Sequence, residues 1–354
     1  MRKLPNRSKK NLAKLSLLIV TLFYAFQFEM LWYGASQLKG QLSILAKRQP
    51  ISEIMADDSF PDSLKTKIMF IDTIKEFCVQ ELGFKPNENY TQVVNLEGKP
   101  VLWTLSASQP YALEPYLWDY PILGKMGYKG YFNSLMLADE KYWLEAKGFD
   151  VCEGEVLAWS TLGFLSDPLL SSMLALNKGR LSRLIIHELT HSEVFLNDDA
   201  ELNENFATFI GDKGSLIFLK KRFGASSKEY QELKTYLEDL KILANYTIYF
   251  KKELEDFYET NSGLPLAELE NLKQQKMAEY LNTLQSQKLQ NPKAFKSLFE
   301  NESLPKNCFF NDIGMYRNSQ QKFEEELAKN YKGDLVAFLN SYKAKYGNKI
   351  NPLR

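Results

Sequence analysis

The sequence predicts an α+β protein in which helices predominate. Seven long segments have apolar residues that recur at helical spacing, and only a few short segments have the composition of β-strands. Apolar residues make up 45% of the chain, which is enough to fill a large core. The helices are predicted at residues 64–82, 133–147, 181–195, 203–222, 227–258, 266–285 and 320–346, and the strands at residues 91–96, 101–106 and 151–160.

Residues 1–34 have the pattern of a membrane anchor. Six basic residues, the last of which is Lys14, precede an apolar and uncharged segment at residues 15–28. No small-x-small cleavage pattern follows at residues 33–35, so we expect the segment to be retained as a single-pass anchor. A positive flank stays in the cytoplasm, which would place the rest of the chain on the outer face of the membrane. A buried interfacial helix of a soluble protein is the alternative.

The charge balance argues against a nucleic-acid partner. The 44 lysine and arginine residues match 44 aspartate and glutamate residues, so nothing in the net charge indicates nucleic-acid binding. The chain contains no glycine-rich phosphate loop and no nucleophile elbow. Its three cysteines, Cys78, Cys152 and Cys308, predict no disulfide framework, although one pair is compatible with an oxidising compartment.

The only two histidines of the chain are four residues apart, in the string His187-Glu188-Leu189-Thr190-His191. Residues at this spacing share one helical face, so both imidazoles can reach one zinc ion while Glu188 reaches a water molecule beside it. The motif therefore predicts a zinc site of the peptidase type. Two core histidines on a mostly apolar helix are the alternative.

A catalytic zinc ion takes three protein ligands, so the motif needs one further donor. No third histidine exists and the cysteines are scattered, which leaves a carboxylate. The best candidate is Glu204, because a polar turn at residues 196–200 would fold the second helix back against the histidine face. Asp198, Asp199 and Glu201 compete for the role from positions in or next to the turn.

A centre of this kind predicts hydrolysis with one zinc ion per chain. Zinc lowers the pKa of a bound water molecule and polarises a carbonyl, while Glu188 would move the proton from the water to the leaving amine. Thr208 lies on the same helical face as Glu204 and is a candidate to orient a histidine ring. Arg183, one turn before His187, is expected to pair with a carboxylate, either a ligand or a structural one.

Beyond the motif, the chain resembles the predicted zinc aminopeptidases of bacterial envelopes, a gluzincin-like group of HExxH metallopeptidases. The likeness is strong from about residue 30 to 215 and weaker at residues 311–316. It implies a zincin-like catalytic core in which His187, His191 and Glu204 bind zinc and Glu188 is the catalytic base. The segments that carry it are residues 32–35, 40–41, 127–132, 158–163, 167–170, 183–191, 198–199 and 203–208.

The resemblance also suggests residues that contact the substrate. Tyr128, Tyr131 and Tyr316 lie in segments that look like the family, and each is a candidate to donate a hydrogen bond to the oxyanion. Ser160 and Thr161 end a predicted strand just before the zinc helix, where zincin folds bind an extended peptide along an edge strand. A plain sheet strand is the alternative interpretation.

The chain divides into four predicted parts. They are the anchor at residues 1–34, a zincin-like catalytic core at 35–222, a helical hairpin arm at 223–290 and a C-terminal helical segment at 291–354 that packs on the core. A cluster of helix-breaking residues at 260–265 folds the arm into a hairpin. We expect the arm to pack on the core, with a docking surface for a partner protein as the alternative.

These observations favour a membrane-anchored zinc metallopeptidase of the bacterial cell envelope, with its catalytic domain on the periplasmic side and peptides or proteins as substrates. Aminopeptidase action follows from the family alone. The Gly-x-Met-Glu-Asn string that binds the substrate amine in one aminopeptidase group is absent, so a zinc endopeptidase is an alternative. A catalytically silent binding protein that retains a structural zinc helix is the other, although a structural site has no need of Glu188.

Overall fold

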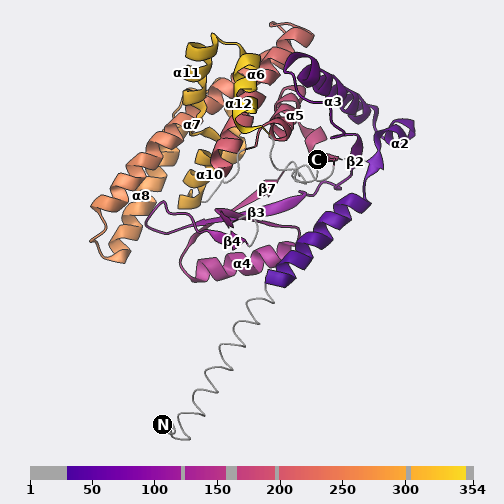
Figure 1. The fold of residues 1–354 in the computed structure, drawn as a ribbon. Helices are drawn as coiled ribbons and strands as arrows, with labels where there is room; N and C mark the ends of the chain where they lie inside the picture. Colours follow the sequence, from indigo (N-terminus) through magenta and orange to yellow (C-terminus); the bar gives the residue numbers. More distant parts are fainter. Residues whose placement is uncertain (1–29, 121–123, 157–165, 196–198, 300–303, 348–354) are drawn as a thin grey trace, which may run out of the picture.

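The computed structural model describes residues 30–120, 124–156, 166–195, 199–299 and 304–347. Helices dominate and three small sheets accompany them, in agreement with the predicted α+β class (Figure 1). Residues 30–46 are helical. The elements that follow are β1 (Gln49–Pro50), α2 (Ile51–Ala56), α3 (Asp62–Glu81), β2 (Gln92–Val94), β3 (Leu102–Ser108), β4 (Trp118–Tyr120), β5 (Gly124–Met126), β6 (Tyr128–Tyr131), α4 (Ser134–Ala146), β7 (Asp150–Val156), β8 (Leu169–Leu170), η1 (Met173–Ala175), α5 (Lys178–Glu193), α6 (Ala200–Phe223), α7 (Lys228–Thr260), α8 (Leu266–Gln285), η2 (Pro292–Phe295), α9 (Lys296–Phe299), α10 (Asn307–Arg317), α11 (Gln320–Tyr331) and α12 (Leu335–Tyr346).

The prediction of a membrane anchor, and of a localisation based on it, has to be corrected. Within the described ranges no helix combines the length and the apolar character needed to cross a bilayer. The apolar segment at residues 15–28, which motivated the prediction, lies outside the described residues. The helix at residues 30–46 carries Gln37, Lys39 and Gln41, so it is not apolar on all sides. It is instead tied to the fold, because the Tyr33 hydroxyl donates a hydrogen bond to the carbonyl oxygen of Gly130 (2.8 Å).

The antiparallel sheet β6-β3-β7 separates α4 from the layer of helices that contains α5 and α10 (Figure 1). In its register, Ser106 of β3 is paired with Tyr128 of β6 and with Cys152 of β7. Residues paired in this way project from the same face of a sheet, so these three side chains share one face. Leu105 and Tyr131 belong to the opposite face and pack with α4 in an apolar cluster.

Two smaller sheets complete the β-structure. One has the order β1-β2-β8, in which β2 and β8 are parallel, and the other pairs β4 with β5. The predicted strands at residues 91–96 and 101–106 correspond to β2 and β3, and β7 covers the first part of the strand predicted at residues 151–160. The end of that predicted strand lies outside the described residues.

The largest apolar core lies among α3, α5, α6, α11 and α12. Aromatic side chains of the last two helices stack on α6, where Phe206 contacts Phe323 and Phe338. The prediction of one continuous helix at residues 320–346 is wrong. The chain turns back at Lys332 and Gly333, whose φ angles of 53° and 82° are left-handed and cannot continue a right-handed helix.

The hairpin of α7 and α8 has an apolar core of its own. Phe250 of α7 and Tyr280 of α8 pack against each other and against Phe310 of α10. The helix α10, which was not predicted from the sequence, is therefore enclosed between the hairpin, α6 and the β6-β3-β7 sheet.

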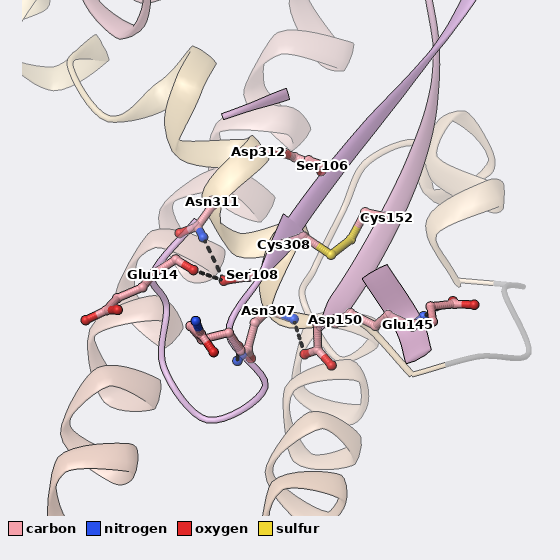
Figure 2. Close-up of a disulfide and its surroundings, with 12 residues drawn as sticks. Ser106, Ser108, Glu114, Glu145, Asp150, Cys152, Asn307, Cys308, Asn311 and Asp312 are labelled. Atoms are coloured by element: carbon pink, nitrogen blue, oxygen red, sulfur yellow. Dashed lines mark hydrogen bonds and ion pairs between the residues drawn. A yellow bond between two sulfur atoms is a disulfide. The ribbon is translucent and has the colours of Figure 1, made fainter. Parts of the chain in front are cut away.

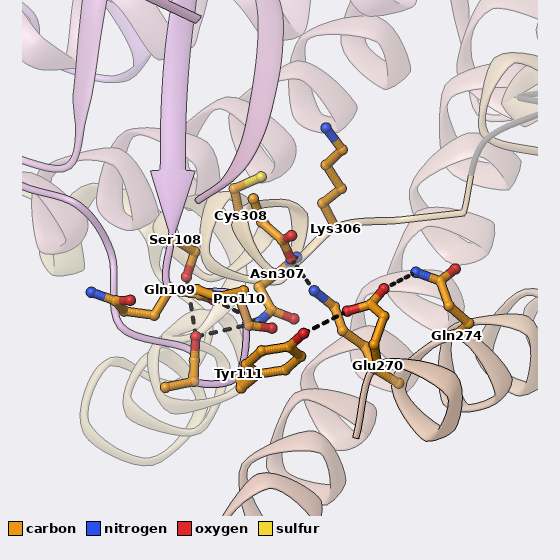
Figure 3. Close-up of polar contacts among 12 residues, drawn as sticks. Ser108, Gln109, Pro110, Tyr111, Glu270, Gln274, Lys306, Asn307 and Cys308 are labelled. Atoms are coloured by element: carbon orange, nitrogen blue, oxygen red, sulfur yellow. Dashed lines mark hydrogen bonds and ion pairs between the residues drawn. The ribbon is translucent and has the colours of Figure 1, made fainter. Parts of the chain in front are cut away.

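The beginning of α10 is fixed by polar and covalent contacts. The Asn307 side-chain amide donates hydrogen bonds to the carbonyl oxygens of Gln109 and Pro110 (2.9 and 3.1 Å; Figure 3). The next residue, Cys308, forms a disulfide with Cys152 of β7 (Figure 2). These contacts hold α10 against the sheet face that carries Ser106 and Tyr128.

Candidate metal centre

Both histidines lie on α5, which the sequence itself delimits. The Asn177 side chain caps its first turn by accepting a hydrogen bond from the backbone of Arg180. Leu181, Ile185, Ile186 and Leu189 are buried. His187 and His191 point from one face of the helix, with ring centroids 4.9 Å apart. The helix confirms the spacing argument, because residues four apart must lie one above the other.

The helix α6 brings Glu204 to this face. Asp199 caps it by accepting a hydrogen bond from the backbone of Leu202, and Glu204 lies one turn further on. The Glu204 carboxylate oxygens are 3.3 Å from Nε2 of His187 and 3.6 Å from Nε2 of His191, and the two nitrogens are 3.3 Å apart.

These distances fit a tetrahedral metal ion. Zinc binds imidazole nitrogen and carboxylate oxygen at about 2.0–2.2 Å, so two donors at a tetrahedral angle are roughly 3.3–3.6 Å apart. All three donor atoms lie within 4.8 Å of one another. A three-donor set of this kind leaves a fourth position open.

The competing carboxylates of the turn have other partners. Asp199 caps α6, and Glu201 accepts a hydrogen bond from the side-chain amide of Asn318 (2.9 Å). Asp198 lies outside the described residues.

The protonation states suit metal binding. Burial lowers the pKa of His191 to about 4, so its imidazole is neutral at neutral pH and its nitrogen lone pair is available. Burial alone would raise the pKa of Glu204, but the hydrogen bond with His187 and the electrostatic influence of the two imidazoles outweigh it and lower the pKa. The Thr208 hydroxyl lies 3.4 Å from Nδ1 of His187 and can hold the ring by its other nitrogen.

Glu188 lies beside the three donors and remains partly accessible to solvent. Burial raises its pKa to about 7, and the negative charges of Glu204 and Asp167 add to this effect against the opposing influence of His187. A carboxylate with a pKa near neutrality can both accept and release a proton. Glu188 thus has the properties of a general base.

The close approach of α5 and α6 depends on a glycine that sequence reasoning did not single out. A Cβ atom at Gly211 would lie 2.9 Å from the carbonyl oxygen of Arg183 and 3.1 Å from Cβ of His187. Only a residue without a side chain lets the two backbones come this close.

Arg183 pairs with a structural carboxylate and not with a ligand. Its guanidinium contacts Asp212 of α6, and Arg317 of α10 contacts the other oxygen of the same carboxylate (2.8 Å). Burial alone would raise the pKa of Asp212, but the two guanidinium charges outweigh it and hold the pKa below its usual value. The cluster of Arg183, Asp212 and Arg317 therefore joins α5, α6 and α10.

The structure separates the three candidate tyrosines. For Tyr128 and Tyr316, the charge of Glu204 adds to the effect of burial in raising the pKa of the hydroxyl. This influence indicates that both side chains lie near the centre. Their side chains are 41% and 46% exposed, which leaves them open to a ligand. Tyr131 is 1% exposed and points to the opposite face of the sheet, where it packs against Tyr33. Ser160 and Thr161 lie outside the described residues.

One set of hydrogen bonds between α6 and α10 was not predicted from the sequence. The side-chain amide of Asn205, next to Glu204, donates hydrogen bonds to the carbonyl oxygens of Met315 (2.9 Å) and Gly314 (3.3 Å). Its side-chain oxygen accepts a hydrogen bond from the backbone of Ser319 (2.9 Å). The weak family likeness at residues 311–316 was the only sequence signal for this region.

Comparison with known proteins supports a peptidase. The profile of a protein family described as "Putative aminopeptidase" matches residues 32–349, which is most of the chain. The chain therefore belongs to this family. No curated protein and no solved structure matches it.

Proposed function

We propose that the protein is a zinc metallopeptidase of the gluzincin-like HExxH type that removes residues from the amino end of peptides. The observation that carries the proposal is the distance set of His187, His191 and Glu204, which matches the edges of a tetrahedral zinc site. Membership of the aminopeptidase family supports the peptidase chemistry.

The two histidines and Glu204 would hold the ion. Zinc bound there would lower the pKa of a water molecule and polarise the scissile carbonyl. Glu188 takes the proton of the attacking water and transfers it to the departing amine, and its raised pKa suits both steps. Thr208 keeps His187 in the orientation that directs Nε2 to the ion.

The two tyrosines near the centre serve the developing oxyanion. The pKa values of Tyr128 and Tyr316 are raised, so both hydroxyls remain protonated and able to donate. A donor aimed at the oxyanion in a partly enclosed site stabilises the transition state more than the ground state. Tyr316 is our first choice, because the charges of both Glu204 and Glu188 act on its hydroxyl.

The substrate is a peptide or protein chain in extended form. Among the described residues β7 is an edge strand of its sheet, and an edge strand can pair with an extended peptide. Ser160 and Thr161, which follow β7 in the sequence, are proposed to contact the substrate beyond its described end.

A direct test uses the purified protein and its Glu188→Gln variant. We expect about one equivalent of zinc in both proteins, and release of residues from unblocked peptides by the wild type alone. Equal turnover by the two proteins would exclude Glu188 as the base. A silent binding protein would bind zinc and hydrolyse nothing in either form, and absence of zinc from both would exclude the metal site.

A further inference from the structure

Asp312 is an acidic residue of α10 that the proposed mechanism does not use. Its Oδ2 accepts a hydrogen bond from the Ser106 hydroxyl of β3 (2.8 Å), as Figure 2 shows. The Asp312 side chain is exposed to solvent, so a ligand can reach it. It lies one helical turn before Tyr316, on the same face of α10.

Asp312 belongs to the same region as the metal centre. Ser106, its hydrogen-bond partner, is paired with Tyr128 in the sheet, so the side chains of both point to the face covered by α10. Tyr128 responds to the charge of Glu204, and Tyr316 responds to the charges of Glu204, Glu188 and Asp312. Asp312 is therefore linked to the candidate metal centre through Tyr128 and Tyr316.

Within the part of the chain that the structure describes, no cation pairs with Asp312. Among the described residues, the one side-chain hydrogen bond of Asp312 is with the neutral hydroxyl of Ser106. Desolvation raises the pKa of Asp312 to about 6. Asp212 pairs with two arginines and Asp150 pairs with Lys273 (2.8 Å), whereas the buried Asp239 accepts hydrogen bonds from two backbone amides. A carboxylate that is partly desolvated and lacks a cation favours a positively charged ligand.

We propose that Asp312 binds the α-ammonium group of an unblocked peptide, so that the first peptide bond of the substrate lies at the metal centre beside Tyr316. The amine and carbonyl of the first residue are separated by a single α-carbon, so the groups that hold them must be close neighbours. Residues four apart on a helix have Cβ atoms about 5–6 Å apart, which suits Asp312 for the amine and Tyr316 for the carbonyl oxygen. This inference rests on the proposed peptidase function and specifies how the amino end is selected.

The test compares two substrates in the zinc-loaded protein. One is an unblocked aminoacyl p-nitroanilide, and the other is a fluorogenic peptide that carries an N-acetyl group. For the unblocked substrate, Asp312→Asn should raise KM and lower kcat/KM roughly 10- to 100-fold, because an ionic hydrogen bond is lost. Activity on the blocked peptide should stay the same or rise. Asp312→Glu, which keeps the charge, should recover part of the preference.

Two further measurements separate binding from folding. An amino acid amide should inhibit the wild type competitively, with a Ki that rises roughly 10- to 100-fold in Asp312→Asn, whereas its N-acetyl form should bind both proteins alike. Asn311→Ala is the matched control, since Asn311 precedes Asp312 and its side-chain amide donates a hydrogen bond to the Ser108 hydroxyl of the sheet (3.3 Å). Its kinetics on both substrates should equal those of the wild type, and all variants should retain zinc.

The outcomes distinguish this inference from the proposed function. If Asp312→Asn lowers the hydrolysis of both substrates equally, Asp312 has a structural role and the inference is wrong. If the wild type cleaves blocked and unblocked peptides equally well, the inference is wrong while the zinc peptidase stands. If zinc-loaded wild type hydrolyses neither substrate, the proposed function fails and the inference fails with it.

Discussion

The Glu204 carboxylate lies 3.3 Å from Nε2 of His187, although the two residues belong to different helices. The helices α5 and α6 pack against each other, and Gly211 lets their backbones come into close contact. The candidate metal centre is therefore formed by one helix pair, and substitutions in this pair are expected to have separable effects.

Replacement of the carboxylate ligand should abolish tight metal binding. Glu204→Gln removes the only anionic donor of the site, so zinc content after dialysis should fall sharply, together with hydrolysis. Glu201→Gln, one turn earlier on α6, is the control and should keep both. If Glu201→Gln loses zinc while Glu204→Gln keeps it, Glu201 is the carboxylate ligand.

Removal of the Thr208 hydroxyl should lower the metal affinity of the site without abolishing metal binding. Thr208→Val leaves Nδ1 of His187 without its neighbour, and the loss of such an outer contact lowers metal affinity about 10- to 100-fold. Competition with a chelator of known affinity measures this change. An unchanged affinity would show that Thr208 does not orient the ring.

Substitution of the tyrosines should rank them as oxyanion donors. Tyr316→Phe should lower kcat by about 10²–10³ while zinc content is unchanged, because one hydrogen bond to the transition state is lost. Tyr131→Phe, on the opposite face of the sheet, should have wild-type kinetics. If Tyr128→Phe has the larger effect, Tyr128 is the main donor. Wild-type activity in both Tyr316→Phe and Tyr128→Phe would leave the oxyanion without a tyrosine donor.

The buried carboxylate of Asp212 should stabilise the fold in a pH-dependent way. Its pKa is lower in the folded than in the unfolded protein, so its stabilisation is present above the unfolded-state pKa of about 3.9 and is lost as the pH falls through the folded-state value. At pH 7, Asp212→Asn should cost about 3–5 kcal/mol, because two arginines lose their partner. The difference from the wild type should shrink below about pH 4. Denaturant titrations at several pH values measure it, with the exposed Asp256→Asn as the control.

The contact between the two helices should not tolerate a larger residue. Gly211→Val would force α5 and α6 apart, at a cost of about 1–3 kcal/mol or more, and should also impair zinc binding. Gly263→Ala, where an added Cβ meets nothing within 4 Å, should leave both properties unchanged. Equal stability of the two variants in denaturant titrations would contradict the close packing at Gly211.

The proximity of His187, His191 and Glu204 could be predicted because the information is local. A helix fixes the relation of His187 to His191, and a short turn followed by a helix leaves few places for Glu204. The long helices could be predicted for the same reason, since periodicity depends on neighbours in the sequence.

The remaining parts of the site depend on contacts between distant segments. The choice between Tyr128 and Tyr131 follows from β6, a strand that was not predicted, because residues three apart on a strand point to opposite faces. The helix α10 is placed by Asn307, by Asp312 and by the disulfide to Cys152, whose partners are remote in the sequence. The membrane anchor was inferred from a basic flank, an apolar segment and the lack of a cleavage pattern, and the apolar segment lies outside the described residues.

The most direct test of the metal centre is the X-ray absorption spectrum of the purified protein at the zinc edge. We expect four-coordinate zinc with two imidazole nitrogens and with oxygen donors at about 2.0–2.2 Å. Sulfur ligands, or zinc without imidazole, would contradict it, as would a protein that takes up no zinc.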